Sequence, residues 1–264
     1  MSELADRCAA ARASGTKLLS IYLTAGFPDR GATLDLARAI FDAGADFMEL
    51  GIPFSDPMAD GPVIQHASTV ALAAGTRLGD VFELCARISA LGPVALMGYF
   101  NSVLGCGEAS FLTAARDAGA QALILPDLLP ENEPEFHRQA QAHGVPTIAF
   151  VAPTTPLPRM QALDQRGAPF VYAVSVTGVT GSRGELPAEV MNYLATVRVA
   201  VRNPLMVGFG VSGGDSARQL AEHADGVIVG SAVIRRIADS ANLAEAVNSV
   251  AALVGEIKQA ISRS

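Results

Sequence analysis

The chain carries eight short runs that are apolar along their whole length, and amphipathic stretches separate them. An apolar run without alternation predicts a strand buried on both faces, as in a parallel sheet that helices cover. The stretches between the runs have the spacing of helices with one apolar face. The expected strands are Leu18–Thr24, Phe47–Leu50, Val94–Phe100, Ala122–Leu125, Thr147–Val151, Phe170–Ser175, Leu205–Gly208 and Gly226–Val229.

Eight strand-helix repeats within 264 residues predict a closed (β/α)₈ barrel, or TIM barrel. A doubly wound sheet fits less well, because it leaves open edges and usually has about five to seven strands. We expect an extra helix at Ser2–Ala13 before the first strand, and a single domain over residues 1–264. Four expected helices end at a glycine, which is typical of repeated helix-to-strand turns: Gly44, Gly119, Gly144 and Gly167.

Composition excludes several classes of partner. Nineteen basic and 26 acidic residues give a formal net charge of −7, and no basic block offsets it, so we expect no nucleic-acid partner. The three cysteines lie far apart and no His stands at metal-ligand spacing, so we expect reduced thiols and no metal site. Charges interrupt every apolar stretch well short of the roughly 20 residues of a membrane span. With no signal-peptide pattern at the start, a soluble, cytoplasmic protein that does not enter membranes is expected.

The segment after the second expected strand holds the densest cluster of polar groups. Active sites of such barrels lie at the C-terminal ends of the strands. Glu49 stands there between Met48 and Leu50, so desolvation should raise its pKa and let it exchange protons near neutral pH. The alternative is that Glu49 pairs with a buried base or caps a backbone amide. Asp60 lies in the following Pro/Gly-rich loop, where aspartate is also common simply because it makes good turns.

Glycine-containing segments follow the last three expected strands, at residues 177–184, at Gly208-Phe209-Gly210 and at Gly230-Ser231. Glycine lets the backbone approach an anion closely, and a helix beginning at Ser231 would direct free N–H groups toward it. A tight turn is the alternative for each segment alone. Three such segments on neighbouring strands predict a phosphate site.

Other groups at strand ends give weaker indications. Tyr22, Tyr99 and Tyr172 lie in or just after strands, where they could line a pocket for an aromatic substrate. A core tyrosine with a satisfied hydroxyl is the alternative. The glycine-rich segment 176–187 is expected to be a mobile lid that orders over bound ligand.

Several segments, in order along most of the chain, resemble signature stretches of tryptophan synthase alpha subunits. They are Tyr22–Gly26, Glu49–Pro62, Val151–Thr155, Val174–Gly181 and Gly208–Gly210. The resemblance implies the (β/α)₈ fold and retro-aldol cleavage of indole-3-glycerol phosphate into indole and glyceraldehyde 3-phosphate. It further implies no cofactor in this chain, and a beta subunit with pyridoxal phosphate as its partner in an α2β2 complex.

The resemblance also implies roles for single residues: Glu49 as general acid and base, and Asp60 as the carboxylate that engages the indole nitrogen. Tyr172 matches a position near the substrate, and Thr180 is expected to reach the ligand once the lid closes. The residues that match the phosphate-site segments of the family are Gly181, Phe209, Gly210, Gly230 and Ser231. Two alternatives stay open, namely another phosphosugar barrel enzyme and a catalytically silent subunit that only binds phosphate ligands.

Six apolar residues fall in expected loops on the catalytic face. That much apolar surface should not stay exposed in a monomer, which predicts a protein partner there. The alternative is that some of these side chains fold inward over the substrate. The six residues are Phe54, Met58, Val103, Leu104, Leu128 and Leu129.

Overall fold

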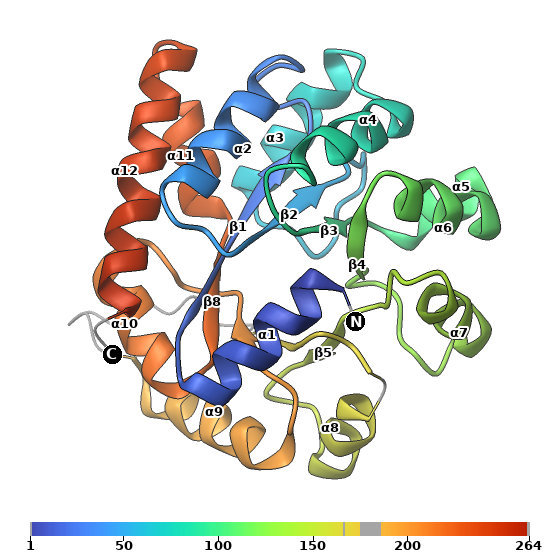
Figure 1. Cartoon of the computed structure of the whole chain (residues 1–264), viewed down its shortest axis with the longest axis vertical. Coiled ribbons are helices and arrows are strands. Elements are labelled where there is room, and N and C mark those ends of the chain that lie inside the picture. The colour runs from blue at the N-terminus through green and yellow to red at the C-terminus, as the bar shows by residue number, and fades with distance from the viewer. Residues whose placement is uncertain (1, 166, 175–185, 263–264) are drawn as a thin grey trace.

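The computed structural model describes residues 2–165, 167–174 and 186–262. Within these ranges, eight parallel strands alternate with helices (Figure 1). The strands are β1 (Leu18–Thr24), β2 (Phe47–Gly51), β3 (Val94–Met97), β4 (Ala120–Ile124), β5 (Ala149–Val151), β6 (Val171–Ala173), β7 (Leu205–Val207) and β8 (Gly226–Val229). The helices are α1 (Glu3–Ser14), α2 (Ala32–Asp42), α3 (Pro62–Ala73), α4 (Leu78–Ile88), α5 (Phe100–Cys106), α6 (Glu108–Asp117), α7 (Pro134–Ala142), α8 (Leu157–Asp164), α9 (Ala188–Ala200), α10 (Gly214–His223), α11 (Ser231–Ala238) and α12 (Leu243–Ile261).

The strands form a barrel in which each strand pairs with its neighbours in sequence and β1 pairs with β8. The barrel closes between β4 and the residues just before β5, where Leu123 and Thr147 form an isolated parallel bridge. There the Leu123 N–H donates to the Pro146 carbonyl at 2.9 Å, and the Ile148 N–H donates to the Leu123 carbonyl at 2.8 Å. The expected TIM barrel is therefore confirmed. β5 is shorter than the expected strand Thr147–Val151, because Thr147 forms only this isolated bridge.

Inward-facing side chains fill the barrel, and α1 covers its N-terminal end. Leu4 of α1 packs in one buried cluster with Phe47 and Phe170 from the strands. Arg12 of α1 also pairs with the buried Asp225 just before β8, with 2.6 Å between Nη1 and Oδ2. The expected N-terminal helix is confirmed, with its bounds shifted by one residue. Since α1 occupies this end, the opposite, C-terminal end of the strands is left for a site.

Glycines in the left-handed region follow the four helices after which they were expected. In this region a side chain would strain the backbone, so glycine is favoured. The turns after α2, α6, α7 and α8 contain Gly44 (φ 105°), Gly119 (φ 79°), Gly144 (φ 78°) and Gly167 (φ 74°). The same turn thus returns the chain to the barrel in four repeats.

The last helix, α12, packs along the outside of the barrel against α2, α10 and α11 (Figure 1). Its Lys258 pairs with Asp46 at 2.6 Å, which ties the helix to the turn before β2. Even this helix is too short or too polar to cross a membrane, and the same holds for every other helix in the described ranges.

The expected third strand, Val94–Phe100, is wrong at its C-terminal end. β3 stops at Met97, and Phe100 begins α5. The cause lies in the turn after β4: the Phe100 N–H donates to both carboxylate oxygens of Asp127, at 3.1 and 3.0 Å. An acceptor at this point favours the start of a helix.

Helix α3 buries only small side chains against its neighbours. Its buried positions are Ala67, Ser68 and Ala71. Small side chains at these positions let a helix approach its neighbours closely. The helix packs against β1 and α11.

Candidate active site

A hollow at the C-terminal ends of the strands brings together most of the expected site residues. It has an inner cavity of about 110 Å³ and an outer cavity of about 380 Å³. The expected residues that line the inner cavity are Tyr22, Glu49, Tyr172, Phe209, Gly210, Gly230 and Ser231. Asp60 lines the outer cavity. The two cavities adjoin each other and share five lining residues, namely Ile64, Met97, Tyr172, Gly208 and Ser231.

Glu49 lies on β2 inside the barrel, with 1 % of its surface exposed. In the parallel register it stands opposite Tyr22 of β1 and Ala95 of β3. Its Oε1 atom is buried and has no hydrogen-bond partner among the described residues. Burial raises the pKa of this carboxyl to about 8. Glu49 therefore does not pair with a buried base in the described part of the chain, and at neutral pH it holds a proton that it can give up.

Asp60 is held in place by a tyrosine that lies between β3 and α5. The Tyr99 hydroxyl donates to Asp60 Oδ2 at 3.0 Å, and the hydroxyl oxygen of Tyr99 accepts from the Ala59 N–H at 3.0 Å. The ring of Tyr99 stacks on Phe54 with 5.2 Å between ring centroids. Burial raises the pKa of Asp60, while the hydrogen bond from Tyr99 lowers it. Tyr99 thus lines neither cavity, but fixes the position of the carboxylate that does.

Two tyrosines lie against the neighbouring strand in places that only a glycine leaves open. A Cβ atom at Gly51 would lie 2.2 Å from the Tyr22 hydroxyl, and one at Gly208 would lie 2.1 Å from the Tyr172 hydroxyl. The Tyr22 hydroxyl shares a hydrogen bond with Thr24 at 3.1 Å, so Tyr22 has the satisfied hydroxyl that is expected of a core tyrosine. Both rings nevertheless form walls of the inner cavity, which suits a flat aromatic ligand.

The glycine segments after β7 and β8 meet at the inner cavity. Gly210 has a φ of 69°, in the region that favours glycine. As expected, α11 begins at Ser231, so its first N–H groups lack partners within the helix. Backbone donors at the positive end of a helix attract an anion. Thr180, Gly181 and most of the expected lid at 176–187 lie outside the described residues.

Several wall residues were missed by sequence reasoning. Met97 and Phe150 line the outer cavity, and both lie at inward positions of their strands. The alternation of inward and outward side chains along a strand could have indicated both residues. Ile64 and Arg235 line it from α3 and α11, and the sequence pattern does not show how these helices lie over the strand ends.

The arrangement supports proton transfer and anion binding. A protonated carboxyl, a fixed carboxylate and backbone donors surround one hollow. Within the described ranges, no three His, Cys, Asp or Glu side chains gather in a way that could hold a metal ion.

Comparisons with known proteins agree with this geometry. The family model described as "Tryptophan synthase alpha chain" matches residues 8–262. The tryptophan synthase alpha chain of Roseiflexus castenholzii is 46 % identical over 243 residues, which cover 91 % of this chain and 93 % of the relative. That of Laribacter hongkongensis is 42 % identical and covers 99 % of both chains.

Solved structures give the same result. The crystal structure of tryptophan synthase subunit alpha from Legionella pneumophila has a TM-score of 0.90 and 36 % identity, and the match covers 100 % of both chains. A tryptophan synthase structure from M. tuberculosis has a TM-score of 0.87 and 31 % identity, with 99 % of this chain and 100 % of that chain covered. The match of the family model includes all eight strands and both candidate carboxylates, and the chain therefore belongs to the tryptophan synthase alpha chain family.

Proposed function

We propose that Glu49 and Asp60 carry the reaction of this lyase family, the cleavage of indole-3-glycerol phosphate into indole and glyceraldehyde 3-phosphate. The observation that carries the proposal is the buried Glu49 carboxyl, whose pKa of about 8 keeps it protonated at neutral pH inside the cavity. Another phosphosugar barrel enzyme, left open by the sequence, does not fit the family match.

The proposed reaction uses one carboxyl for two proton transfers. Glu49 first donates its proton to C3 of the indole ring, which makes the ring cationic. The resulting carboxylate then takes the proton of the side-chain hydroxyl as the carbon–carbon bond breaks. The bonding electron pair returns to the ring and neutralises it, while the former hydroxyl carbon becomes a carbonyl. Glu49 ends protonated again, ready for another turnover.

Asp60 would stabilise the cationic ring. Protonation at C3 leaves a positive charge that C2 and the indole nitrogen share, and a carboxylate held beside that N–H lowers the energy of the transition state. The hydrogen bond from Tyr99 keeps Asp60 Oδ2 in a fixed position, so little reorganisation is needed during the reaction. Tyr22 and Tyr172 would bind the ring, while Phe209, Gly210, Gly230 and Ser231 would bind the phosphate end. From the family resemblance, Thr180 and Gly181 would contribute to the same phosphate site.

The direct test is to incubate the purified chain with indole-3-glycerol phosphate and to measure indole, with and without a tryptophan synthase beta subunit. Release of indole supports the proposal. A chain that releases none under either condition would instead be a silent subunit that only binds phosphate ligands.

Replacing Asp60 by Asn should lower the rate of cleavage by about 10²-fold, because the neutral amide cannot stabilise the developing cation. The matched control is Asp56→Asn in the same loop, at an exposed position that lines neither cavity. The measurement is kcat for each variant at saturating substrate. Equal rates in the two variants would return Asp60 to a role in the turn alone.

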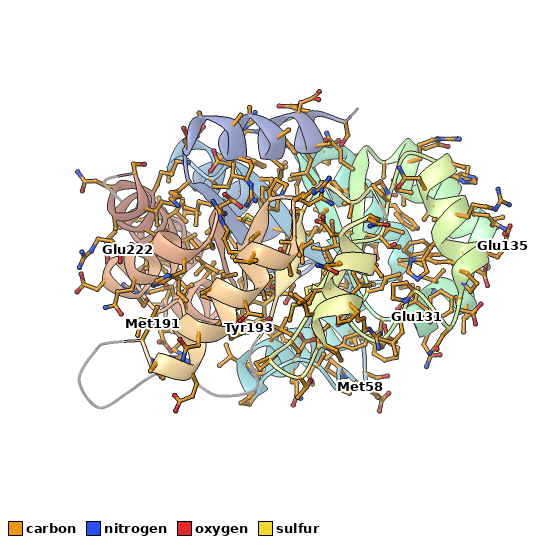
Figure 2. The ribbon with its side chains drawn as sticks, turned by 90° about the horizontal axis from the view of Figure 1, so that it is seen from below. Met58, Glu131, Glu135, Met191, Tyr193 and Glu222 are labelled. Atoms are coloured by element: carbon orange, nitrogen blue, oxygen red, sulfur yellow. The ribbon has the colours of Figure 1, made fainter. Side chains whose placement is uncertain are left out.

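We also propose that a beta subunit carrying pyridoxal phosphate binds over the catalytic face, in an α2β2 complex in the cytoplasm. Three of the six apolar residues noted above are exposed there: Met58 (83 %), Leu104 (53 %) and Leu129 (46 %). Met58 lies at the end of the molecule opposite α1 (Figure 2). Val103 and Leu128 are buried instead, and α5 replaces the loop expected around Leu104.

Charged substitutions on this surface test the partner. Met58→Asp and Leu104→Asp should each weaken binding of the beta subunit by about tenfold or more, since exposed apolar anchors at an interface lose their packing. Cleavage by the isolated variants should change much less. The control is Val199→Asp on α9, a residue with 87 % of its surface exposed outside the proposed interface. The reverse pattern, with cleavage lost and binding kept, would indicate that Met58 and Leu104 act within the chain.

A further inference from the structure

Arg235 is a charged residue at the substrate cavity, and the mechanism proposed for Glu49 and Asp60 gives it no role. It lines the outer cavity together with Asp60 and Ser231. Among the described residues that line either cavity, it is the one with a Lys, Arg or His side chain. The chain as a whole is negative, with a formal net charge of −7, so a cation at this position stands out against its surroundings.

The geometry of α11 directs Arg235 toward the anion-binding end of the helix. Arg235 lies four residues after Ser231, so both lie on one face of the helix. Long side chains in a helix lean toward its N-terminus and cover the preceding turn. The guanidinium is therefore carried toward Ser231, where the free N–H groups of α11 lie.

The guanidinium of Arg235 is also not engaged by the protein. In the described ranges it forms no ion pair or hydrogen bond, and it is not among the causes of the pKa shift of Asp60. The neighbouring Arg236 differs, because its Nη1 lies 3.5 Å from Ser249 Oγ on α12 and it lines neither cavity. Of these two adjacent arginines, Arg235 thus lies at the cavity and Arg236 lies against α12.

We propose that Arg235 binds the phosphate group of the substrate and sets the preference of the site for phosphorylated ligands. A phosphate monoester carries up to two negative charges, and a guanidinium can bind two of its oxygens at once. Arg235 adds this charged contact to the backbone donors at Ser231. The inference deepens the proposed function and rests on it, because the substrate there is a phosphate ester.

The test compares Arg235→Gln with Arg236→Gln, which removes the same charge from the adjacent residue. Binding of glycerol 3-phosphate is measured by calorimetry, and kcat and KM are measured for indole-3-glycerol phosphate. Arg235→Gln should weaken glycerol 3-phosphate binding and raise KM by about tenfold or more, with kcat within about twofold. Arg236→Gln should leave all three values within about twofold. Arg235→Lys should restore part of the affinity, since it keeps the charge but loses the paired donors.

Indole, which has no phosphate, is the ligand control. Its affinity should be the same in the parent protein and in Arg235→Gln. Equal effects of the two Gln variants, or an equal loss of indole binding, would overturn the proposal. A parent protein that binds glycerol 3-phosphate but releases no indole would contradict the proposed function, while the binding data would still decide the role of Arg235.

Discussion

Replacing Glu49 by Gln should remove cleavage of indole-3-glycerol phosphate by about 10³-fold or more. The two side chains are nearly the same size, but the amide can neither donate the proton that C3 needs nor accept the proton of the hydroxyl. General acid–base catalysis contributes about 10²–10⁴-fold for one transfer, and here one group serves two. The measurement is single-turnover formation of indole, which separates chemistry from product release.

Binding of glycerol 3-phosphate is the control for this variant, because Gln is nearly the same size as Glu and the change leaves the backbone donors of the phosphate site in place. The affinity should stay within a few-fold of the parent. The pH dependence gives an independent check. Since the acid form of Glu49 starts the reaction, the rate in the parent protein should fall as the pH rises through about 8. A Gln variant with comparable turnover, or a rate that keeps rising well above pH 8, would contradict the assignment.

The barrel could be predicted because its strands are buried on both faces. β1 and β8 have the expected bounds, and each is apolar along nearly its whole length. The glycines after the helices could also be predicted, because the left-handed turn restricts the residue type. Strand ends were harder to place, since a strand stops where its partner stops. β5 shows this: Thr147 makes only a bridge to Leu123.

The burial of the Glu49 carboxyl could be predicted in the same way as the fold. Glu49 interrupts an apolar strand at its C-terminal end, and that position alone implies burial and a raised pKa. Asp60 could not be separated from a turn residue without the family resemblance. Its partner Tyr99 lies 39 residues further along the chain, so only the folded structure shows the hydrogen bond.

The helical part of the site could not be predicted from periodicity. α3 and α11 bring Ile64 and Arg235 to the outer cavity. Arg235 is exposed, as most arginines are, and nothing in its neighbours distinguishes it from Arg236. The difference arises from how α11 sits against α3 and α12, which is a property of packing in three dimensions.

The buried carboxyl should also make the protein less stable as the pH rises, and Glu49→Gln should remove this effect. In the unfolded chain Glu49 loses its proton near its ordinary pKa of 4.5, whereas in the folded chain it keeps the proton up to about pH 8. Between these values the unfolded state binds fewer protons than the folded state. The free energy of unfolding therefore falls by up to about 1.4 kcal/mol per pH unit from this group.

Urea unfolding of both proteins at several pH values between 4 and 9 measures this contribution. All other groups titrate alike in the two chains, so the difference in their free energies of unfolding isolates Glu49. Relative to the parent, the Gln variant should gain on the order of 4 kcal/mol between pH 4 and pH 8.5, and the gain should level off above the folded pKa. Below about pH 4.5 the difference should not depend on pH, because Glu49 is then protonated in both states. Parallel pH curves for the two proteins would mean that the Glu49 carboxyl ionises in the folded chain as it does in water, and that the protonated acid on which the mechanism depends does not exist.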